Sequence, residues 1–210
     1  NNAAIDFGTS NVGGALNVTA SSGTITQNGG ALTVAGTSAF TTSTNDQAIT
    51  LSNTSNALTG AVAFTTGGTT GNVVIDNGTT ALDLAASTIN GTLTATGGAS
   101  AGIVDSGNVA VAGNVTLTTD AGNGVINMGT LQQSAGDLIL VTNGNGAATV
   151  VNNAGIDFGT SNVGGALNAT PSSGNITQNG GALTVAGTSS FTLGANSANV
   201  VLDHASNAFS

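Results

Sequence analysis

The chain has 210 residues and no lysine, arginine or cysteine, and its only formal charges are nine aspartates, which give a net charge of −9. A chain without cations has nothing to neutralise phosphates, which argues against nucleic acid as a partner. No uninterrupted apolar run approaches the roughly 18 residues that a membrane helix needs, so we expect no membrane insertion. Strand-forming Val, Ile and Thr are plentiful, while the residues that cover the solvent face of helices are almost absent, which predicts an all-β protein.

Long repeats run through the chain. The stretch ITQNGGALTVAGTS occurs letter for letter at 25–38 and 176–189, and the flanking residues 1–41 and 152–192 align at the same shift of 151 with five differences. A fainter similarity divides this period into two units of about 75 residues, and such periods are typical of repeat architectures. We therefore expect one repeat segment within a longer array, made of units 1–81, 82–155 and a partial 156–210.

A shorter element recurs eight times in chain order: a glycine, one residue, and then an apolar residue, often followed two positions later by a second one. Because side chains alternate across a strand, each element predicts a strand with one buried face. The predicted core positions are Leu16, Val18, Leu32, Val34, Val62, Phe64, Leu93, Val109, Val111, Leu138, Leu140, Leu167, Leu183 and Val185. The predicted turn glycines are Gly14, Gly30, Gly60, Gly91, Gly107, Gly136, Gly165 and Gly181.

The spacing of these elements suggests how the strands stack. Their first apolar residues are Leu16, Leu32, Val62, Leu93, Val109, Leu138, Leu167 and Leu183, and subtraction of neighbouring sequence numbers gives steps of 16, 30, 31, 16, 29, 29 and 16. We interpret each step as one circuit of a parallel β-helix (β-solenoid), which gives about eight circuits in a short–long–long pattern. The interpretation puts the first four of these residues, from Leu16 to Leu93, in one interior column. A sandwich or barrel of short strands is the competing architecture.

Residues with catalytic or metal-binding chemistry are sparse. Aspartates such as Asp83 and Asp105 could pair for glycoside hydrolysis, but the aspartates occupy repeat-equivalent or turn positions. His204 has no second histidine, cysteine or glutamate to form a metal site or a triad. The sequence thus predicts a non-enzymatic protein with no catalytic, cofactor-binding or metal-binding residues and no cofactor, beyond weak divalent cation binding to an anionic rod.

The stretches GNITQNGGALTVAGTSSFT (174–192) and NVVLDHASNAFS (199–210), together with the interior 60–96, resemble the repeats of filamentous-haemagglutinin-like exoproteins and other giant bacterial surface adhesins. The resemblance covers essentially the whole chain. It implies a right-handed parallel β-helix, an extracellular place at the bacterial cell surface, and a role in adhesion, biofilm, sheath or surface fibre.

Three functional hypotheses follow. The first is a non-enzymatic structural segment, a stiff shaft of an extracellular fibre or adhesin, whose partners are flanking repeats or other copies stacked end to end, and host or matrix glycans. The second is a binding surface for glycan or ice on the same solenoid. The third is a carbohydrate-active β-helix enzyme.

Overall fold

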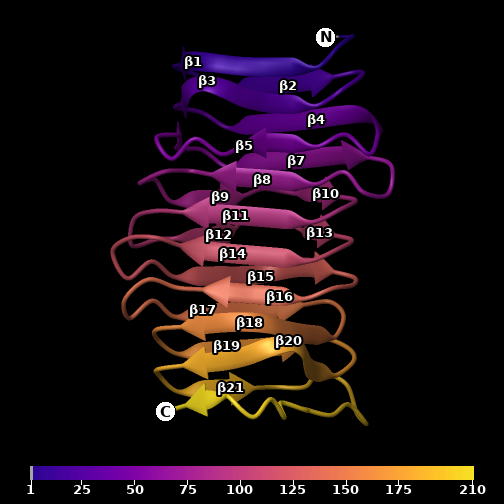
Figure 1. Ribbon diagram of the computed structural model, residues 1–210, viewed down its shortest axis with the longest axis vertical. Coiled ribbons are helices and arrows are strands. Elements are labelled where there is room, and N and C mark those ends of the chain that lie inside the picture. The colour runs from indigo at the N-terminus through magenta and orange to yellow at the C-terminus, as the bar shows by residue number, and fades with distance from the viewer. Residues whose placement is uncertain (1) are drawn as a thin grey trace.

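The computed structural model describes residues 2–210 and coils them into a rod with the two ends of the chain at opposite ends of the long axis (Figure 1). The described residues form 22 strands and no helix, so none of them belongs to a helix that could cross a membrane. The strands form two sheets of eleven, in which the strands pair in parallel and belong to successive circuits. This confirms the predicted all-β parallel solenoid, with about nine turns where about eight were expected; the right-handed sense of the coil stays a prediction.

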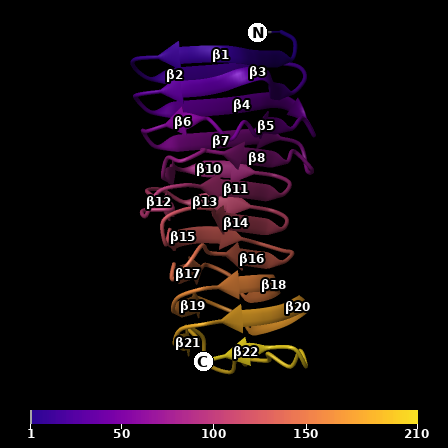
Figure 2. The ribbon, with the colours of Figure 1, turned by 60° about the vertical axis from the view of Figure 1, so that its left-hand side comes forward.

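The first sheet, sheet A, contains β1 (Ile5–Val12), β3 (Ile25–Val34), β5 (Ile49–Leu51), β8 (Val73–Asp76), β11 (Leu93–Gly97), β14 (Val115–Thr119), β16 (Leu138–Val141), β18 (Ile156–Val163), β20 (Ile176–Val185) and β22 (Ala208–Phe209) in spatial order, with β6 (Ala57–Leu58) also paired to β3. The second, sheet B, contains β2 (Leu16–Ala20), β4 (Ser38–Asn45), β7 (Val62–Gly67), β9 (Leu82–Leu84), β10 (Ser87–Ile89), β12 (Ile103–Asp105), β13 (Val109–Val111), β15 (Ile126–Gln133), β17 (Ala148–Asn152), β19 (Leu167–Pro171) and β21 (Ser189–Phe191). Turning the rod shows the strands of both sheets stacked along its axis (Figure 2).

One column of paired residues in sheet A gives the length of a circuit. The column is Ile5, Ile25, Ile49, Val73, Leu93, Val115, Leu138 and Phe158. The shortest step in this column, such as Ile5 to Ile25, is only four positions shorter than the longest, Ile25 to Ile49. Each circuit therefore takes a little over twenty residues, and the circuits are of nearly equal length.

The predicted interior column and the short–long–long pattern of circuits are wrong. Leu16 and Val62 lie in sheet B, whereas Leu32 and Leu93 lie in sheet A, and all eight predicted elements alternate between the sheets. The short step from Leu16 to Leu32 is less than a circuit, and the long step from Leu32 to Val62 covers nearly one and a half circuits. The physical reason is that strands of both sheets follow a tight glycine turn and carry inward apolar residues. The pattern identifies where a strand starts but not to which sheet it belongs.

The core runs along the rod between the two sheets. Of the fourteen predicted core positions, twelve are at most 2% exposed, while Leu16 and Val18 in the first circuit are half-buried and pack against the core. Phe40 and Phe64 stack in neighbouring circuits with ring centroids 5.8 Å apart, and Phe7 meets Phe40 edge-on at 6.2 Å. Stacked circuits thus bury one another's apolar side chains.

The predicted turn glycines have two structural reasons. Gly30, Gly136 and Gly181 have φ values of 138°, 81° and 136°, in the region that favours glycine. A second group has no positive φ but packs directly against the preceding circuit, so that a Cβ would collide with it; this group is Gly60, Gly91, Gly107 and Gly165. Gly14 lies in the first circuit, and a Cβ there would meet nothing within 4 Å.

Candidate functional site

Four of the nine aspartates, the only formally charged side chains of the protein, hold neighbouring circuits together. Asp46 Oδ1 accepts hydrogen bonds from the backbone N–H groups of Thr69 and Thr70, both at 2.8 Å, in the next circuit. Asp105 accepts from the backbone N–H groups of Gly129 at 2.8 Å and Thr130 at 2.7 Å. Charged acceptors make such bonds stronger than neutral ones.

Asp6 and Asp157, at equivalent positions of the long repeat, make the same pair of contacts. Asp6 accepts hydrogen bonds from the Thr26 hydroxyl and the Asn28 backbone N–H, each at 3.0 Å. Asp157 accepts from the corresponding groups of residues 177 and 179, also at 3.0 Å. We call Asp6, Asp46, Asp105 and Asp157 the aspartate clamps, because each joins its own circuit to the following one.

These hydrogen bonds affect the acidity of two clamps. The pKa of Asp6 is lowered, chiefly by the hydrogen bond from the Asn28 side-chain amide. The pKa of Asp46 is lowered by the backbone N–H groups, with that of Thr69 the largest cause. A carboxyl group with a lowered pKa stays ionised near neutral pH and is a poor general acid, so the chemistry of these two groups is that of hydrogen-bond acceptors.

Buried asparagines occupy corners where the chain leaves a strand. Asn77 is fully buried; its Oδ1 accepts the Leu58 N–H at 2.8 Å and its Nδ2 donates to the Leu58 carbonyl at 3.0 Å. Asn152 holds Gln133 in the same way, at 2.8 and 3.0 Å. Asn56 likewise accepts the Leu32 N–H at 2.8 Å and pairs in addition with the Gln27 side chain, and its half-buried repeat equivalent Asn207 makes the corresponding contacts in the last circuit. These residues satisfy backbone groups that water does not reach.

Buried threonines occupy a second kind of corner. The Thr119 hydroxyl donates to the Gly124 carbonyl at 2.9 Å and accepts the Asn143 N–H of the next circuit at 3.1 Å. The hydroxyls of Thr66 and Thr142 make the same two contacts, one within the turn and one to the next circuit. Sequence reasoning missed both kinds of corner. Their signal is a polar residue in an inward position of a strand, followed within a few positions by a glycine turn.

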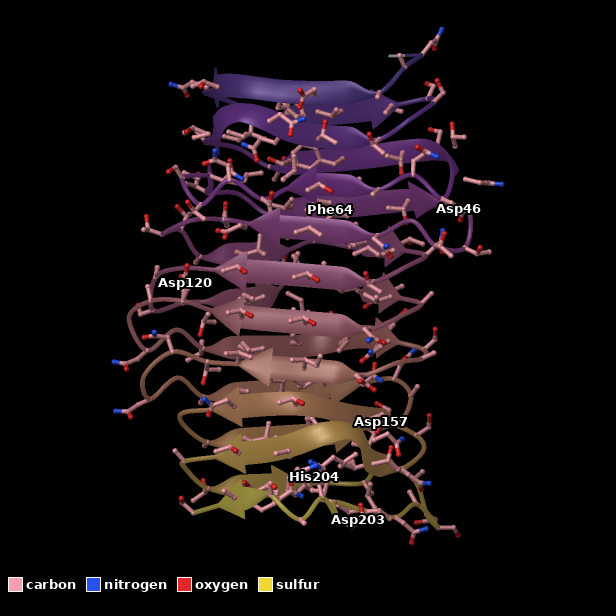
Figure 3. The ribbon with its side chains drawn as sticks, viewed as in Figure 1. Asp46, Phe64, Asp120, Asp157, Asp203 and His204 are labelled. Atoms are coloured by element: carbon pink, nitrogen blue, oxygen red, sulfur yellow. The ribbon has the colours of Figure 1, made fainter. Side chains whose placement is uncertain are left out.

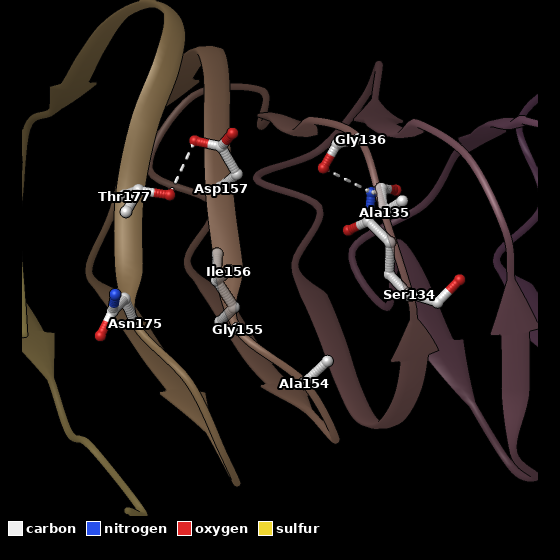
Figure 4. A pocket seen from close by; sticks show the side chains of 10 residues that line it. Ser134, Ala135, Gly136, Ala154, Gly155, Ile156, Asp157, Asn175 and Thr177 are labelled. Atoms are coloured by element: carbon white, nitrogen blue, oxygen red, sulfur yellow. Dashed lines mark hydrogen bonds between the residues drawn. The ribbon is translucent and has the colours of Figure 1, made fainter. Parts of the chain in front are cut away.

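The surface carries a shallow recess of about 280 Å³ beside Asp157, between the turns that precede β16 and β18 (Figure 4). Its lining is Gln133, Ser134, Ala135, Gly136, Ala154, Gly155, Ile156, Asp157, Asn175 and Thr177. Asp157 is the only charged residue in this lining, and its carboxylate already accepts the Thr177 hydroxyl. The recess offers hydrogen-bonding groups to a small polar molecule and no aromatic platform.

The residues singled out in the sequence for catalysis do not converge. Asp83 and Asp105 lie on adjacent strands, but the register places Asp105 opposite Leu84. Asp83 Oδ1 is buried without a hydrogen-bond partner, whereas Asp105 is a clamp.

His204 lies on the last circuit, far along the rod from Asp46 (Figure 3). It is exposed, and its Nδ1 accepts the Ser206 N–H at 3.2 Å. Over residues 2–210, no three His or Asp side chains gather into a group that could hold a metal ion.

Comparison with known proteins gives one match. The model of a family described as repeats of unknown function (DUF5649) matches the chain three times, over residues 1–65, 70–139 and 145–210. Neither a curated protein nor a solved structure matches the chain.

Proposed function

The chain belongs to this family of repeats (DUF5649), and on that premise we propose that it is a non-enzymatic structural segment, the stiff shaft of an extracellular bacterial surface fibre or adhesin. The mechanism is mechanical. Stacked backbone hydrogen bonds and a continuous apolar core hold the circuits in line, so that the segment spaces or joins what lies at its two ends.

The observation that carries the proposal is the unbroken connection from circuit to circuit. Sheet A runs through ten strands from β1 to β22 without a break in its pairing. The aspartate clamps and the buried asparagine and threonine corners add bonds between the same circuits. Four of the nine aspartates are thereby used to join circuits.

An extracellular place is supported by composition and by resemblance. The outward side chains are mostly Thr, Asn, Ser and Ala, and the absence of Lys and Arg leaves no cleavage site for trypsin-like proteases. The resemblance to filamentous-haemagglutinin-like repeats points the same way. Adhesion, biofilm, sheath and fibre formation are the roles that such a shaft would serve.

The partner we propose is a further circuit of the same repeat. Val200 and Phe209 in the last circuit are 41% and 44% exposed, whereas the equivalent residues of the first copy, Ile49 and Leu58, are 0% exposed beneath the following circuit. Another circuit on top, from the same chain or from another copy, would bury the exposed part of these side chains; burial of a whole large apolar side chain from full exposure is worth about 1.5–3 kcal/mol.

Small-angle X-ray scattering of the purified chain tests the shaft. Nine steps between neighbouring strands from β1 to β22, at about 4.8 Å each, give a core about 43 Å long. The pair-distance distribution should be that of an elongated particle. A distribution typical of a sphere would contradict the proposal.

A binding surface for glycan or ice is a second candidate, which one observation favours. The register brings the outward residues Thr50, Val74, Thr94, Thr116 and Ile139 into one column on sheet A, and three of the five are threonines. Glycan-array binding or thermal hysteresis that is lost in a Thr94→Lys/Thr116→Lys variant would support this candidate. If the unmodified chain shows neither glycan binding nor thermal hysteresis, this second candidate function is excluded.

A further inference from the structure

The chain contains seven Asn-Gly dipeptides, the sequence most prone to deamidation. In this dipeptide the backbone nitrogen of the glycine can attack the side-chain amide carbon of the asparagine, because glycine has no side chain to obstruct the approach. The asparagines concerned are Asn28, Asn77, Asn90, Asn123, Asn143, Asn145 and Asn179. Attack requires a free asparagine side chain and a free glycine N–H, and the structure supplies these unequally.

Side-chain hydrogen bonds restrain three of the seven. The amide of Asn28 donates to the Asp6 carboxylate at 3.0 Å, and that of Asn179 donates to the Asp157 carboxylate at 2.6 Å. The amide of Asn90 donates to a backbone carbonyl of the preceding circuit at 2.5 Å. Each side chain must break its bond before it can rotate towards the following nitrogen.

Hydrogen bonds of the glycine N–H restrain three more. The N–H groups of Gly78, Gly124 and Gly146, which follow Asn77, Asn123 and Asn145, are each engaged. They donate to the Asp76 carboxylate at 2.8 Å and to the carbonyls of residues 121 and 143 at 2.9 and 3.0 Å. In addition, Asn77 is fully buried and both atoms of its side-chain amide are used.

Asn143–Gly144 escapes both restraints. Among residues 2–210, neither the Asn143 side chain nor the Gly144 N–H has a hydrogen-bond partner, and both residues are exposed. Gly144 has a φ of 55° in a surface turn, and the base of that turn is anchored by the buried Thr142 hydroxyl and by the Asn143 backbone N–H. These two hydrogen bonds do not involve the Asn143 side chain or the Gly144 nitrogen, which are the reacting groups. The turn can therefore react while the circuit stays folded.

We propose that Asn143 is a site of spontaneous deamidation. The Gly144 nitrogen bonds to Cγ of Asn143, the side-chain nitrogen leaves as ammonia with the proton of the Gly144 N–H, and a succinimide ring remains. Water opens the ring at either carbonyl and leaves aspartate or isoaspartate at position 143. The product adds a negative charge to a chain that has no cation to offset it.

Peptide mapping of the folded chain, kept in mildly alkaline buffer, tests the proposal. A protease that cuts before aspartate releases residues 137–156 from the unmodified chain and cuts this peptide again before position 143 where aspartate has formed. Mass spectrometry then measures the new fragments, and it locates isoaspartate by the change from amide to acid in the uncut peptide. Because one hydrogen bond that must break first slows a reaction by about twofold to tenfold, Asn143 should react faster than each of the other six asparagines by about twofold or more.

Two comparisons separate the effect of the fold from that of the dipeptide. Asn143→Gln should remove the fast product, and the matched variant Asn145→Gln, in the same turn, should leave it unchanged. In denaturant all seven asparagines should react at similar rates. Equal rates in the folded chain, faster reaction at any other Asn-Gly, or no reaction at Asn143 would overturn the proposal.

Discussion

Asn77 illustrates how single polar residues hold this rod together. An asparagine followed by a glycine is typical of an exposed turn. The Asn77 side chain is nevertheless buried and hydrogen-bonded to both the N–H and the carbonyl of Leu58. The sequence could not reveal this, because the register that brings the two residues together is not written in either segment alone. Residues whose burial depends only on alternation, such as Val62, could be predicted.

Replacement of Asn77 by alanine should destabilise the chain by about 2–4 kcal/mol, since it leaves the N–H and the carbonyl of Leu58 buried without partners. Native-state hydrogen exchange at the Leu58 amide measures the effect locally. Asn17→Ala, at an exposed position, is the control and should change exchange little. Unchanged protection of Leu58 in the Asn77 variant would show that the corner contributes nothing.

The Asp46 clamp should weaken in acid. Its pKa is lowered from 3.8 in the folded chain, so the clamp stabilises the fold above that pH and loses its contribution as the pH falls through the folded pKa. Exchange protection of the Thr69 and Thr70 amides, corrected for intrinsic rates, should therefore fall in that range. Asp46→Asn keeps an acceptor oxygen but does not titrate, so its protection should be lower at neutral pH and flat in acid. Equal acid sensitivity in both proteins would argue against the clamp.

At the scale of strands, the repeated glycine-apolar element predicts correctly where strands begin. It predicts incorrectly which strands lie side by side. Leu16 and Leu32 look alike in sequence because each begins a buried stretch after a glycine turn, but they lie in different sheets. What separates them is the length of chain used per circuit, which depends on corner geometry. The bulge at Gly8 and Gly29, where β1 and β3 change register, is one such corner.

The identical stretches at 25–38 and 176–189 contain a glycine that the bulge requires. Gly30 has a φ of 138°, and a Cβ there would collide with the Thr9 side chain, so Gly30→Ala should cost about 1–3 kcal/mol. Gly14→Ala enters open space and should stay within about 0.5 kcal/mol of the unmodified chain. Chemical denaturation of both variants checks this, and equal stability of the two would refute the explanation of why both copies carry this glycine.

At the scale of the whole molecule, repetition made the architecture predictable. A long period with few changes, short alternating strands and almost none of the charged residues that cover the solvent face of helices leave a stack of circuits as the natural solution, because one circuit cannot bury its own apolar side. The number of circuits was harder to predict, because successive elements lie in alternate sheets, so that the steps between them are less than a circuit or well over one. The aspartate clamps were the hardest feature to predict from the sequence, because each clamp joins residues from different circuits.

Distances between spin labels along sheet A test the stacking most directly, and the absence of native cysteine keeps the labelling specific. Thr26→Cys is paired in turn with Thr94→Cys, Thr116→Cys or Thr177→Cys, which lie three, four and seven strands further along sheet A. With about 4.8 Å per strand, the separations should be near 14, 19 and 34 Å and should increase in that order. A label at Thr177 that lies nearer to Thr26 than the label at Thr116 does would contradict the stacked solenoid.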